Sequence, residues 1–140
     1  MKLIEQEIPG FFLMESEPVF DERGVFRRNF CRSTLASVGI EFDPVQGNIS
    51  ENTHKHTLRG FHYQRAPYTE GKILTCLTGG IFNVVVDLRH DSPTYMFYQS
   101  VIISDMSRVS LLVPPGCANA FLTLHDSTIV HYYMSAEFVP

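Results

Sequence analysis

The stretch KILTCLTGGIFNVVVDLR, residues 72–89, decides the fold class. It contains two short runs rich in Val, Ile, Leu and Phe, separated by a TGG sequence at residues 78–80. Short runs of this composition bounded by glycine are typical of β-strands, and TGG is typical of a tight turn. We therefore predict two consecutive strands, residues 72–80 and 81–89, joined by a hairpin at 78–80.

Similar windows recur at short intervals along the rest of the chain, at residues 24–32, 59–64, 96–104, 108–114, 119–124 and 128–134. Only RSTLASVG, residues 32–39, has a helical character, because it opens with a Ser/Thr capping pair and ends at Gly39. We expect an all-β fold, a sandwich or jelly-roll barrel, with one short helix.

The composition bounds the size of the fold and the kind of partner. A length of 140 residues and an apolar content of 44% predict a single domain over residues 1–140 with a packed core. The formal net charge of −4 argues against nucleic acid and anionic membranes as partners, because both bind broad basic surfaces. A local basic pocket for one phosphorylated small molecule remains compatible with that charge.

The cysteines and the N-terminal segment bear on the compartment. Cys31, Cys76 and Cys117 are odd in number, widely spaced and free of any CxxC pattern. Such cysteines suggest free thiols in a reducing compartment, so we expect a cytoplasmic protein. The N-terminal segment carries acidic residues, and nowhere do about 18 apolar residues run together. We therefore expect a chain that is neither exported nor membrane-spanning.

Strand periodicity places several polar side chains on apolar faces, where each must either be hydrogen-bonded within the protein or take part in binding or catalysis. Lys72 shares a face with Leu74, and Asn83 shares one with Val85 and Asp87. Lys72 could therefore point inward, although periodicity alone does not say which face of a strand is inside.

His62, Lys72 and Tyr132 are the candidates for proton chemistry, and each has a simpler structural alternative. Imidazole titrates near neutral pH, so His62 is either a general base or a barrel histidine bonded to a backbone carbonyl. Lys72 is either a surface lysine with a buried stem or the group that stabilises an oxyanion. Tyr132 is either a core tyrosine with a bonded hydroxyl or a proton donor.

Arg23 and Arg59 are the candidates for phosphate binding. Each precedes a glycine, which lets a backbone approach a ligand closely while the guanidinium grips phosphate as a fork. The alternative for both is a surface arginine at a turn. Gln46 and Asn48 flank Gly47, and they are either ligand contacts or turn residues.

The sequence HKH at residues 54–56 has the spacing that would put two imidazoles on one side of a strand, as a metal site requires. No Glu follows at a convincing distance, and a polar loop is the simpler interpretation. We expect His54 and His56 to be loop residues, and we expect no bound metal.

Several motifs are informative when taken together: FDERGVF (20–26), QGNIS (46–50), DSPTY (91–95), VPPGCANAF (113–121) and VHYYMSAEFVP (130–140). The most specific is LRGFHYQ (58–64), which is followed by Lys72, then VDLR (86–89) and PPG (114–116). With these motifs the chain resembles the dTDP-4-dehydrorhamnose 3,5-epimerases, from about residue 20 to its end.

The resemblance implies a cupin-like jelly roll that works without a metal or other cofactor. It implies a homodimer that exchanges β-structure between its subunits. The implied substrate is a nucleotide-diphosphate sugar, a 4-keto-6-deoxy sugar of deoxysugar and polysaccharide pathways. In such a sugar the hydrogens on C3 and C5 lie next to the C4 ketone, so their removal gives an enolate, and reprotonation on the opposite face inverts the centre.

The resemblance also implies roles for individual residues. His62 matches the family's proton-abstracting base, Lys72 the group that stabilises the enolate oxygen, and Tyr132 the proton donor on the other face. The residues that match substrate contacts are Arg23 and Arg59 for the diphosphate, Gln46 and Asn48 for the nucleotide or sugar, and Phe20 and Phe26 for base packing. Some of these contacts are expected to cross the dimer.

Three side chains depart from the family's pattern at positions that we expect to affect substrate binding. Asn119 stands where the family usually has His in its AHGF motif, and Asn83 stands where a strand usually carries Asp. Both members of an expected polar pair are therefore amides. Arg28 stands where the family commonly has a Glu that contacts the substrate.

A further departure concerns the partner of the catalytic histidine. In the family a carboxylate that orients this histidine lies after the last strand, whereas this sequence ends at Pro140. Asp87, a water molecule or another internal group are candidates to orient His62 instead. We expect an epimerase with an altered substrate or only one epimerised carbon, with loss of activity as a second outcome.

Two other functions remain open on the sequence. One is a related cupin isomerase that moves the keto group between C4 and C3 with the same proton chemistry. The other is a noncatalytic dimer that binds a sugar nucleotide. The sequence does not decide the nucleotide base, the sugar, the inverted carbon or the pathway.

Overall fold

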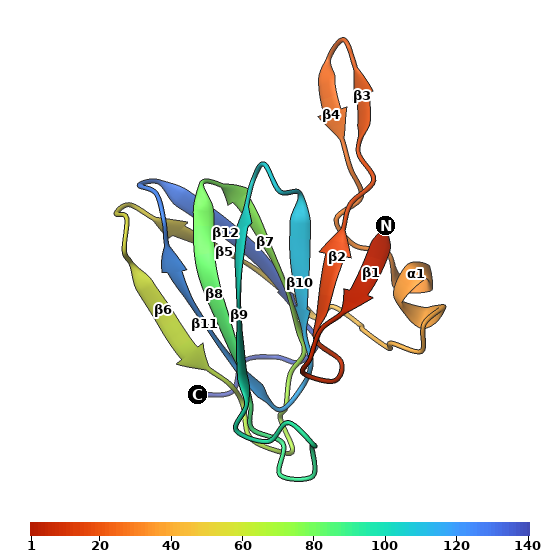
Figure 1. Ribbon diagram of the computed structural model, residues 1–140, viewed down its shortest axis with the longest axis vertical. Helices are drawn as coiled ribbons and strands as arrows, with labels where there is room; N and C mark the ends of the chain where they lie inside the picture. The colour runs from red at the N-terminus through yellow and green to blue at the C-terminus, as the bar shows by residue number, and fades with distance from the viewer.

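The computed structural model describes residues 1–140 and consists of two facing antiparallel β-sheets, one projecting hairpin and one short helix (Figure 1). The larger sheet has the order β1-β2-β10-β7-β12-β5, with β1 (Lys2–Glu5), β2 (Phe12–Glu15), β5 (Gln46–Asn52), β7 (Lys72–Thr78), β10 (Val109–Val113) and β12 (Thr128–Met134). The smaller sheet has the order β6-β11-β8-β9, with β6 (Leu58–His62), β8 (Gly80–Asp87), β9 (Tyr98–Ser104) and β11 (Cys117–Thr123). The predicted all-β class is confirmed.

The main core lies between the two sheets. Leu74 and Val130 contribute to it from the larger sheet, and Val85 and Phe121 contribute from the smaller one. Strand periodicity brings them together, because every second side chain of a strand points to the same face. Burying one such side chain contributes about 1.5–3 kcal/mol to folding, so the core fixes which strand faces point inward.

A second apolar cluster lies on the other face of the larger sheet, beneath α1 (Arg32–Ala36). Leu35 is fully buried there and belongs to the same cluster as Phe42 and Ile73. The helix is shorter than the predicted 32–39, and Ser33 and Thr34 lie inside it instead of capping it. Cys31 occupies the N-cap position and makes no side-chain capping bond.

The TGG sequence at residues 78–80 is not a hairpin, so that prediction is wrong. β7 pairs with β10 and β12, whereas β8 pairs with β11 and β9, and the chain passes from one sheet to the other at Gly79. Gly79 has a φ of 78°, and a Cβ there would lie 2.6 Å from Thr128 Oγ1. A short glycine link serves either a hairpin or a change of sheet, and local sequence does not distinguish the two.

Several strand boundaries also differ from the prediction. The window 24–32 forms a strand only at β4 (Gly24–Phe26), which pairs with β3 (Val19–Asp21). β1, β2, β3 and β5 were not predicted. β5 has a polar sequence, QGNISEN, and it becomes a strand because it pairs along its whole length with β12.

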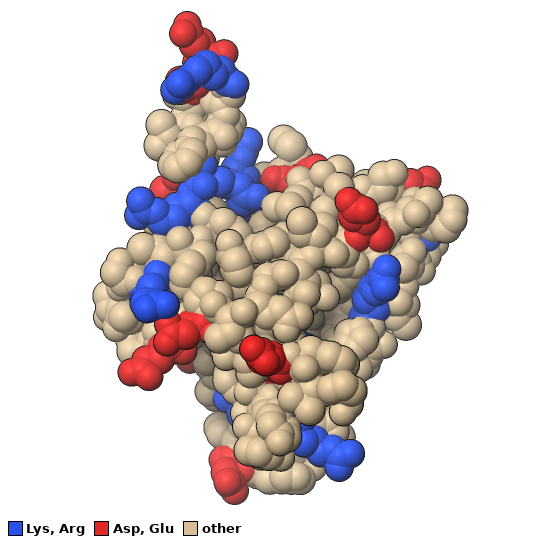
Figure 2. Space-filling view, turned by 180° about the vertical axis from the view of Figure 1, so that it is seen from behind, with Lys and Arg blue, Asp and Glu red and all other residues tan.

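The β3–β4 hairpin projects away from the sandwich (Figure 1). Its aromatic side chains are largely exposed, Phe20 by 63% and Phe26 by 73%. In Figure 2 acidic and basic side chains lie side by side at its tip, and Lys and Arg side chains gather near its base on that face. The one helix, α1, is too short to cross a membrane.

Candidate functional site

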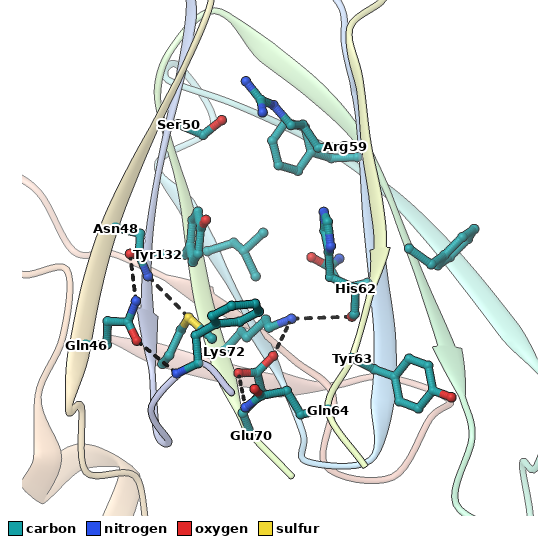
Figure 3. Close-up of a pocket in the computed structure, with 16 residues that line it drawn as sticks. Gln46, Asn48, Ser50, Arg59, His62, Tyr63, Gln64, Glu70, Lys72 and Tyr132 are labelled. Atoms are coloured by element: carbon teal, nitrogen blue, oxygen red, sulfur yellow. Dashed lines mark hydrogen bonds and ion pairs between the residues drawn. The ribbon is translucent and has the colours of Figure 1, made fainter. Parts of the chain in front are cut away.

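A cavity of 540 Å³ opens between the two sheets (Figure 3). β5, β7 and β12 of the larger sheet contribute one wall, and β6 and β11 of the smaller sheet contribute the other. The inward faces of these strands carry polar side chains at this end of the sandwich instead of core residues. Of the polar groups that periodicity placed on apolar faces, Lys72 lines this cavity, whereas Asn83 and Asp87 do not.

His62 and Tyr132 lie on opposite walls of the cavity (Figure 3). His62 ends β6, where it is paired with Asn119 of β11. Tyr132 lies in the middle of β12, where it is paired with Asn48 on one side and Leu74 on the other. The His62 imidazole is exposed to the cavity, and no side chain of residues 1–140 hydrogen-bonds to it. Two groups able to exchange protons thus face one another across the same space.

Lys72 lies at the floor of the cavity, and it is not the surface lysine of the alternative interpretation. Only 9% of its side chain is exposed, and its Nζ lies 2.8 Å from Glu70 Oε1. Nζ also donates to the carbonyl oxygen of His62 at 3.3 Å. The sequence interpretation missed Glu70, although its position two residues before Lys72 offers a signal for a charge pair.

Gln46 and Asn48 lie on β5, so the alternative of turn residues is wrong for both. Their side chains share the face that lines the cavity, and Gln46 Nε2 donates to Asn48 Oδ1 at 3.0 Å. Asn48 Nδ2 contacts Met134 Sδ at 3.2 Å across the strand pair. The polar amides on this wall are held in place by one another and by β12.

Arg59 lines the cavity from β6, and its Nε donates to Asn52 Oδ1 at 3.0 Å. Gly60, which follows Arg59, lies against the backbone of β11. It has a φ of 108°, and a Cβ there would lie 2.6 Å from the carbonyl oxygen of Asn119. Glycine at this position allows β6 to lie close against β11, which positions His62.

Asn119 and Asn83 form the expected amide pair. Asn119 Nδ2 lies 2.7 Å from Asn83 Oδ1. Asn119 lines the cavity, whereas Asn83 is fully buried behind it and does not reach the cavity surface. A change at Asn83 would therefore reach a ligand only through Asn119.

Four candidate substrate contacts lie away from the cavity of their own chain: Phe20, Arg23, Phe26 and Arg28. Arg23 is at the turn of the β3–β4 hairpin, where it pairs with Asp21 at 2.5 Å, and its hydrogen bonds lower the pKa of the Asp21 carboxyl. Phe26 and Arg28 border a separate depression of 180 Å³ at the base of the hairpin, together with Glu17. Within one chain the structure does not bring these residues to His62.

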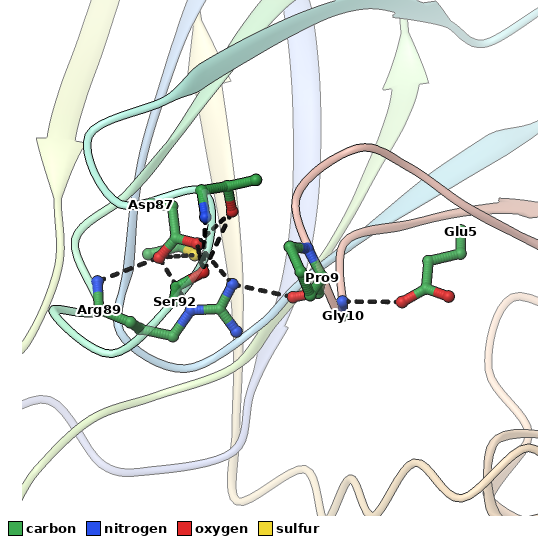
Figure 4. Close-up of polar contacts among 8 residues, drawn as sticks. Glu5, Pro9, Gly10, Asp87, Arg89 and Ser92 are labelled. Atoms are coloured by element: carbon green, nitrogen blue, oxygen red, sulfur yellow. Dashed lines mark hydrogen bonds and ion pairs between the residues drawn. The ribbon is translucent and has the colours of Figure 1, made fainter.

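Asp87 does not orient His62, so that candidate is excluded by geometry. Its carboxylate accepts hydrogen bonds from Arg89 at 2.8 Å, Ser92 at 2.5 Å and Thr94 at 2.7 Å (Figure 4). Burial alone would raise the pKa of Asp87, but these hydrogen bonds outweigh it and hold the pKa well below its usual range. Arg89 also donates to the carbonyl oxygen of Pro9, so Asp87 belongs to a structural network.

His54 and His56 lie in the exposed loop between β5 and β6, as predicted. The carbonyl oxygen of His54 accepts from Thr57 Oγ1 and Thr123 Oγ1, which shapes the loop. Because the two histidines are not on a strand, the His-x-His spacing does not place both imidazoles on one side.

Residues 137–139 join the two walls at the edge of the cavity, a feature that sequence interpretation missed. The backbone N–H of Val139 donates to Gln64 Oε1 at 2.6 Å, and that of Phe138 donates to Gln46 Oε1 at 3.2 Å. Phe138 itself lines the cavity. A stretch as short and irregular as this one offers no periodic pattern from which the contact could be predicted.

The model of one protein family, described as dTDP-4-dehydrorhamnose 3,5-epimerase, matches residues 5–140. The chain belongs to this family. A dTDP-4-dehydrorhamnose 3,5-epimerase of Shigella flexneri is 39% identical over 127 residues, which cover 90% of this chain and 70% of that protein.

Solved structures of the epimerase family share the fold. The dTDP-4-dehydrorhamnose 3,5-epimerase of Bacillus anthracis, solved with TDP and PPi bound, matches with a TM-score of 0.95 and 35% identity, over 99% of this chain and 79% of that one. A 3′-monoepimerase of Streptomyces bikiniensis in complex with dTDP-quinovose matches with a TM-score of 0.89 and 29% identity, over 96% and 68%. The cupin-like architecture implied by the epimerase motifs is confirmed.

Proposed function

We propose that this chain epimerises C3, C5 or both in a dTDP-linked 4-keto-6-deoxy sugar. One observation carries the proposal: His62 and Tyr132 face each other across the cavity, and Lys72 lies at its floor. Inversion of a carbon requires a base on one side of the sugar ring and an acid on the other. Membership of the epimerase family supports this choice of reaction over other proton transfers.

The proposed chemistry uses three side chains. His62 takes the proton from the carbon next to the ketone, and the electron pair moves to the keto oxygen to form an enolate. Lys72 donates a hydrogen bond to that oxygen and stabilises its negative charge. Tyr132 then gives its proton to the same carbon from the opposite face, which restores the ketone and inverts the centre. Proton exchange with solvent resets His62 and Tyr132.

The two cations of the cavity suggest how the substrate lies. Arg59 pairs with no carboxylate and lies toward one end of the cavity, while Lys72 pairs with Glu70 near the other (Figure 3). An unpaired guanidinium is suited to grip a diphosphate as a fork. We therefore place the diphosphate at Arg59 and the sugar near Lys72, with Gln46, Asn48 and Asn119 as polar contacts.

A second copy of the chain is part of the proposal. An isolated two-stranded hairpin is at best marginally stable in water, and the β3–β4 hairpin leaves Phe20 and Phe26 largely exposed, although the Arg108 guanidinium lies 5.2 Å from the centroid of the Phe20 ring. We propose a homodimer in which each hairpin covers the partner's cavity. Arg23 and Phe26 would then bind the substrate in the partner's cavity. Arg28 at the base of the hairpin and Asn83 behind Asn119 would affect substrate binding without lining the cavity of their own chain.

The reaction can be tested by incubating the protein with dTDP-4-keto-6-deoxyglucose in deuterated water and following C3 and C5 by NMR. Deuterium incorporation is expected at one or both carbons, and it should fall about 10²- to 10⁴-fold in His62→Ala, while formation of the inverted product should fall by a similar factor in Tyr132→Phe. His90→Ala and Tyr95→Phe change an exposed histidine and an exposed tyrosine outside the cavity, so they serve as matched controls. Full exchange in His62→Ala and full formation of the inverted product in Tyr132→Phe would refute the assignment.

The same experiment identifies the inverted carbon. The similarity to a 3′-monoepimerase supports a reaction at C3 alone as the second candidate. Deuterium at C3 only would select it, while deuterium at both carbons would select the 3,5-epimerase. A keto group that moves to C3 would instead identify a ketoisomerase, and binding without exchange would identify a noncatalytic binder.

A further inference from the structure

Glu70 places a buried carboxylate at the floor of the cavity. Only 4% of its side chain is exposed, and its Oε1 lies 2.8 Å from Lys72 Nζ. We propose that Glu70 is a positioning residue that holds the Lys72 ammonium so that one of its N–H bonds points into the cavity. The catalytic consequence of this inference rests on the proposed function, whereas the orientation of the ammonium does not.

The donors of Lys72 can be counted. An ammonium group has three N–H bonds and no acceptor. One of them is directed to Glu70 Oε1 at 2.8 Å and another to the carbonyl oxygen of His62 at 3.3 Å. Lys72 lines the cavity, so the third N–H is left for a ligand there. Two fixed acceptors therefore determine where the remaining donor points.

Glu70 is itself held on its other oxygen. Gln64 Nε2 donates to Glu70 Oε2 at 3.0 Å. The same Nε2 lies 3.0 Å from the carbonyl oxygens of Tyr68 and Glu137, and Gln64 Oε1 accepts from the backbone N–H of Val139. Both carboxylate oxygens of Glu70 are thus engaged, which makes Glu70 a support for Lys72 and not a second base.

The charge of Glu70 has its own effect. Burial disfavours an ammonium ion unless an opposite charge is close. The other titratable or charged groups that line the cavity are Arg59, His62, Tyr63 and Tyr132, and none of them is a carboxylate. Glu70 is therefore the only carboxylate that lines the cavity, and it supplies the opposite charge beside the buried ammonium.

Two substitutions separate charge from position. Glu70→Gln keeps the size and removes the charge. The exchange rate at saturation should fall about 10- to 100-fold with little change in KM. Glu70→Asp keeps the charge on a shorter side chain. It should also lower the rate with little change in KM, and it tests the inference if Glu70→Gln does not fold.

A double-mutant cycle with Lys72→Met tests whether Glu70 acts through Lys72. In the Lys72→Met background, Glu70→Gln should cause no further loss of exchange, since the group that it positions is already absent. Glu51→Gln on β5 makes the same chemical change at an exposed position and should leave the exchange rate and KM unchanged. Additive losses in the cycle would overturn the inference.

The lysine ammonium signal in ¹⁵N NMR spectra provides a readout that does not depend on turnover. A slowly exchanging signal that disappears in Lys72→Arg is assigned to Lys72, and it should be lost or strongly shifted in Glu70→Gln but kept in Glu51→Gln. A Lys72 signal unchanged in Glu70→Gln would overturn the inference. If the wild-type protein exchanges no deuterium with any nucleotide sugar, the proposed function fails, and the ammonium signal still decides the role of Glu70.

Discussion

Lys72 Nζ donates a hydrogen bond to the backbone carbonyl oxygen of His62 at 3.3 Å, and this bond joins the two sheets at the floor of the cavity. β7 carries the ammonium and β6 carries the imidazole, and the two strands belong to different sheets. This contact therefore ties the position of Lys72 to that of His62. A shift of either strand would change the distance between the two groups on which the proposed reaction depends.

Lys72→Met should affect both catalysis and stability. Loss of the donor to the enolate oxygen should lower deuterium exchange about 10²- to 10³-fold. It also leaves Glu70 buried without its cation, which should lower the free energy of unfolding by about 3 kcal/mol. Denaturant unfolding of Lys72→Met and of Lys72→Met/Glu70→Gln checks this. The double variant should recover much of the lost stability, and equal stabilities of the two would contradict the buried charge pair.

Asp87 should make the protein sensitive to acid. Its pKa is lower in the folded chain than the ordinary value of 3.8, so the folded state favours the ionised form. The stabilisation is present above the unfolded pKa, and it is lost progressively as the pH falls below about 4 toward the folded pKa. Urea unfolding between pH 7 and pH 3 should show this loss.

Asp87→Asn is the matched change for that experiment. It should lower the stability at pH 7 by about 3 kcal/mol, because Arg89 loses its partner, and it should flatten the dependence on pH. A variant whose stability falls with acid as steeply as the wild type would assign the acid sensitivity to other carboxylates.

Gly60→Ala should disturb β6 and the histidine at its end. The φ of 108° is unfavourable for alanine, and the new Cβ would lie 2.6 Å from the Asn119 carbonyl oxygen. We expect a loss of more than about 1 kcal/mol in stability and a lower exchange rate. Gly47→Ala is the control for stability, because a Cβ there meets Tyr133 at an ordinary distance of 3.8 Å. The unfolding temperature should fall further in Gly60→Ala than in Gly47→Ala when both variants are unfolded by heat.

The proposed exchange of hairpins can be tested by subunit complementation. Arg23→Ala should weaken both cavities of a homodimer, and His62→Ala should inactivate both. A mixture refolded together should contain heterodimers in which one cavity has an intact His62 and an intact partner's hairpin. Recovery of deuterium exchange above that of either variant is expected. No recovery, with heterodimers verified by mass spectrometry, would place Arg23 outside the site.

The cysteines should differ sharply in reactivity. Hydrogen bonds from Ser33 and Thr34 lower the pKa of Cys31 to about 6, while burial raises the pKa of Cys76 to about 11 and that of Cys117 to about 12. Iodoacetamide at pH 7 should therefore modify Cys31 alone in the folded protein, since the thiolate is the reactive form. Peptide mass spectrometry reads the sites, and a denatured sample in which all the cysteines react is the control.

The class of the fold was predictable from sequence, whereas the direction of Lys72 was left open. Periodicity placed Lys72 on the same face as Leu74, but Ile73 and Leu74 are both buried, so only the packing of the two sheets decided which face lines the cavity. His62 and Tyr132 were recognised as candidates because their chemistry and motifs are local. In each case the information lies within a few neighbouring residues.

Other features were decided only by the tertiary structure. The TGG link joins two sheets because β7 and β8 find their partners elsewhere in the chain, and β5 is a strand only because it pairs with β12. Glu70 became part of the site when the fold buried it beside Lys72, and the hairpin with Arg23 came to project from the sandwich. The local sequence pattern therefore determined the all-β class and several of the strands. Pairing and burial join residues far apart in sequence, so the tertiary structure decided the remaining strands and the cavity.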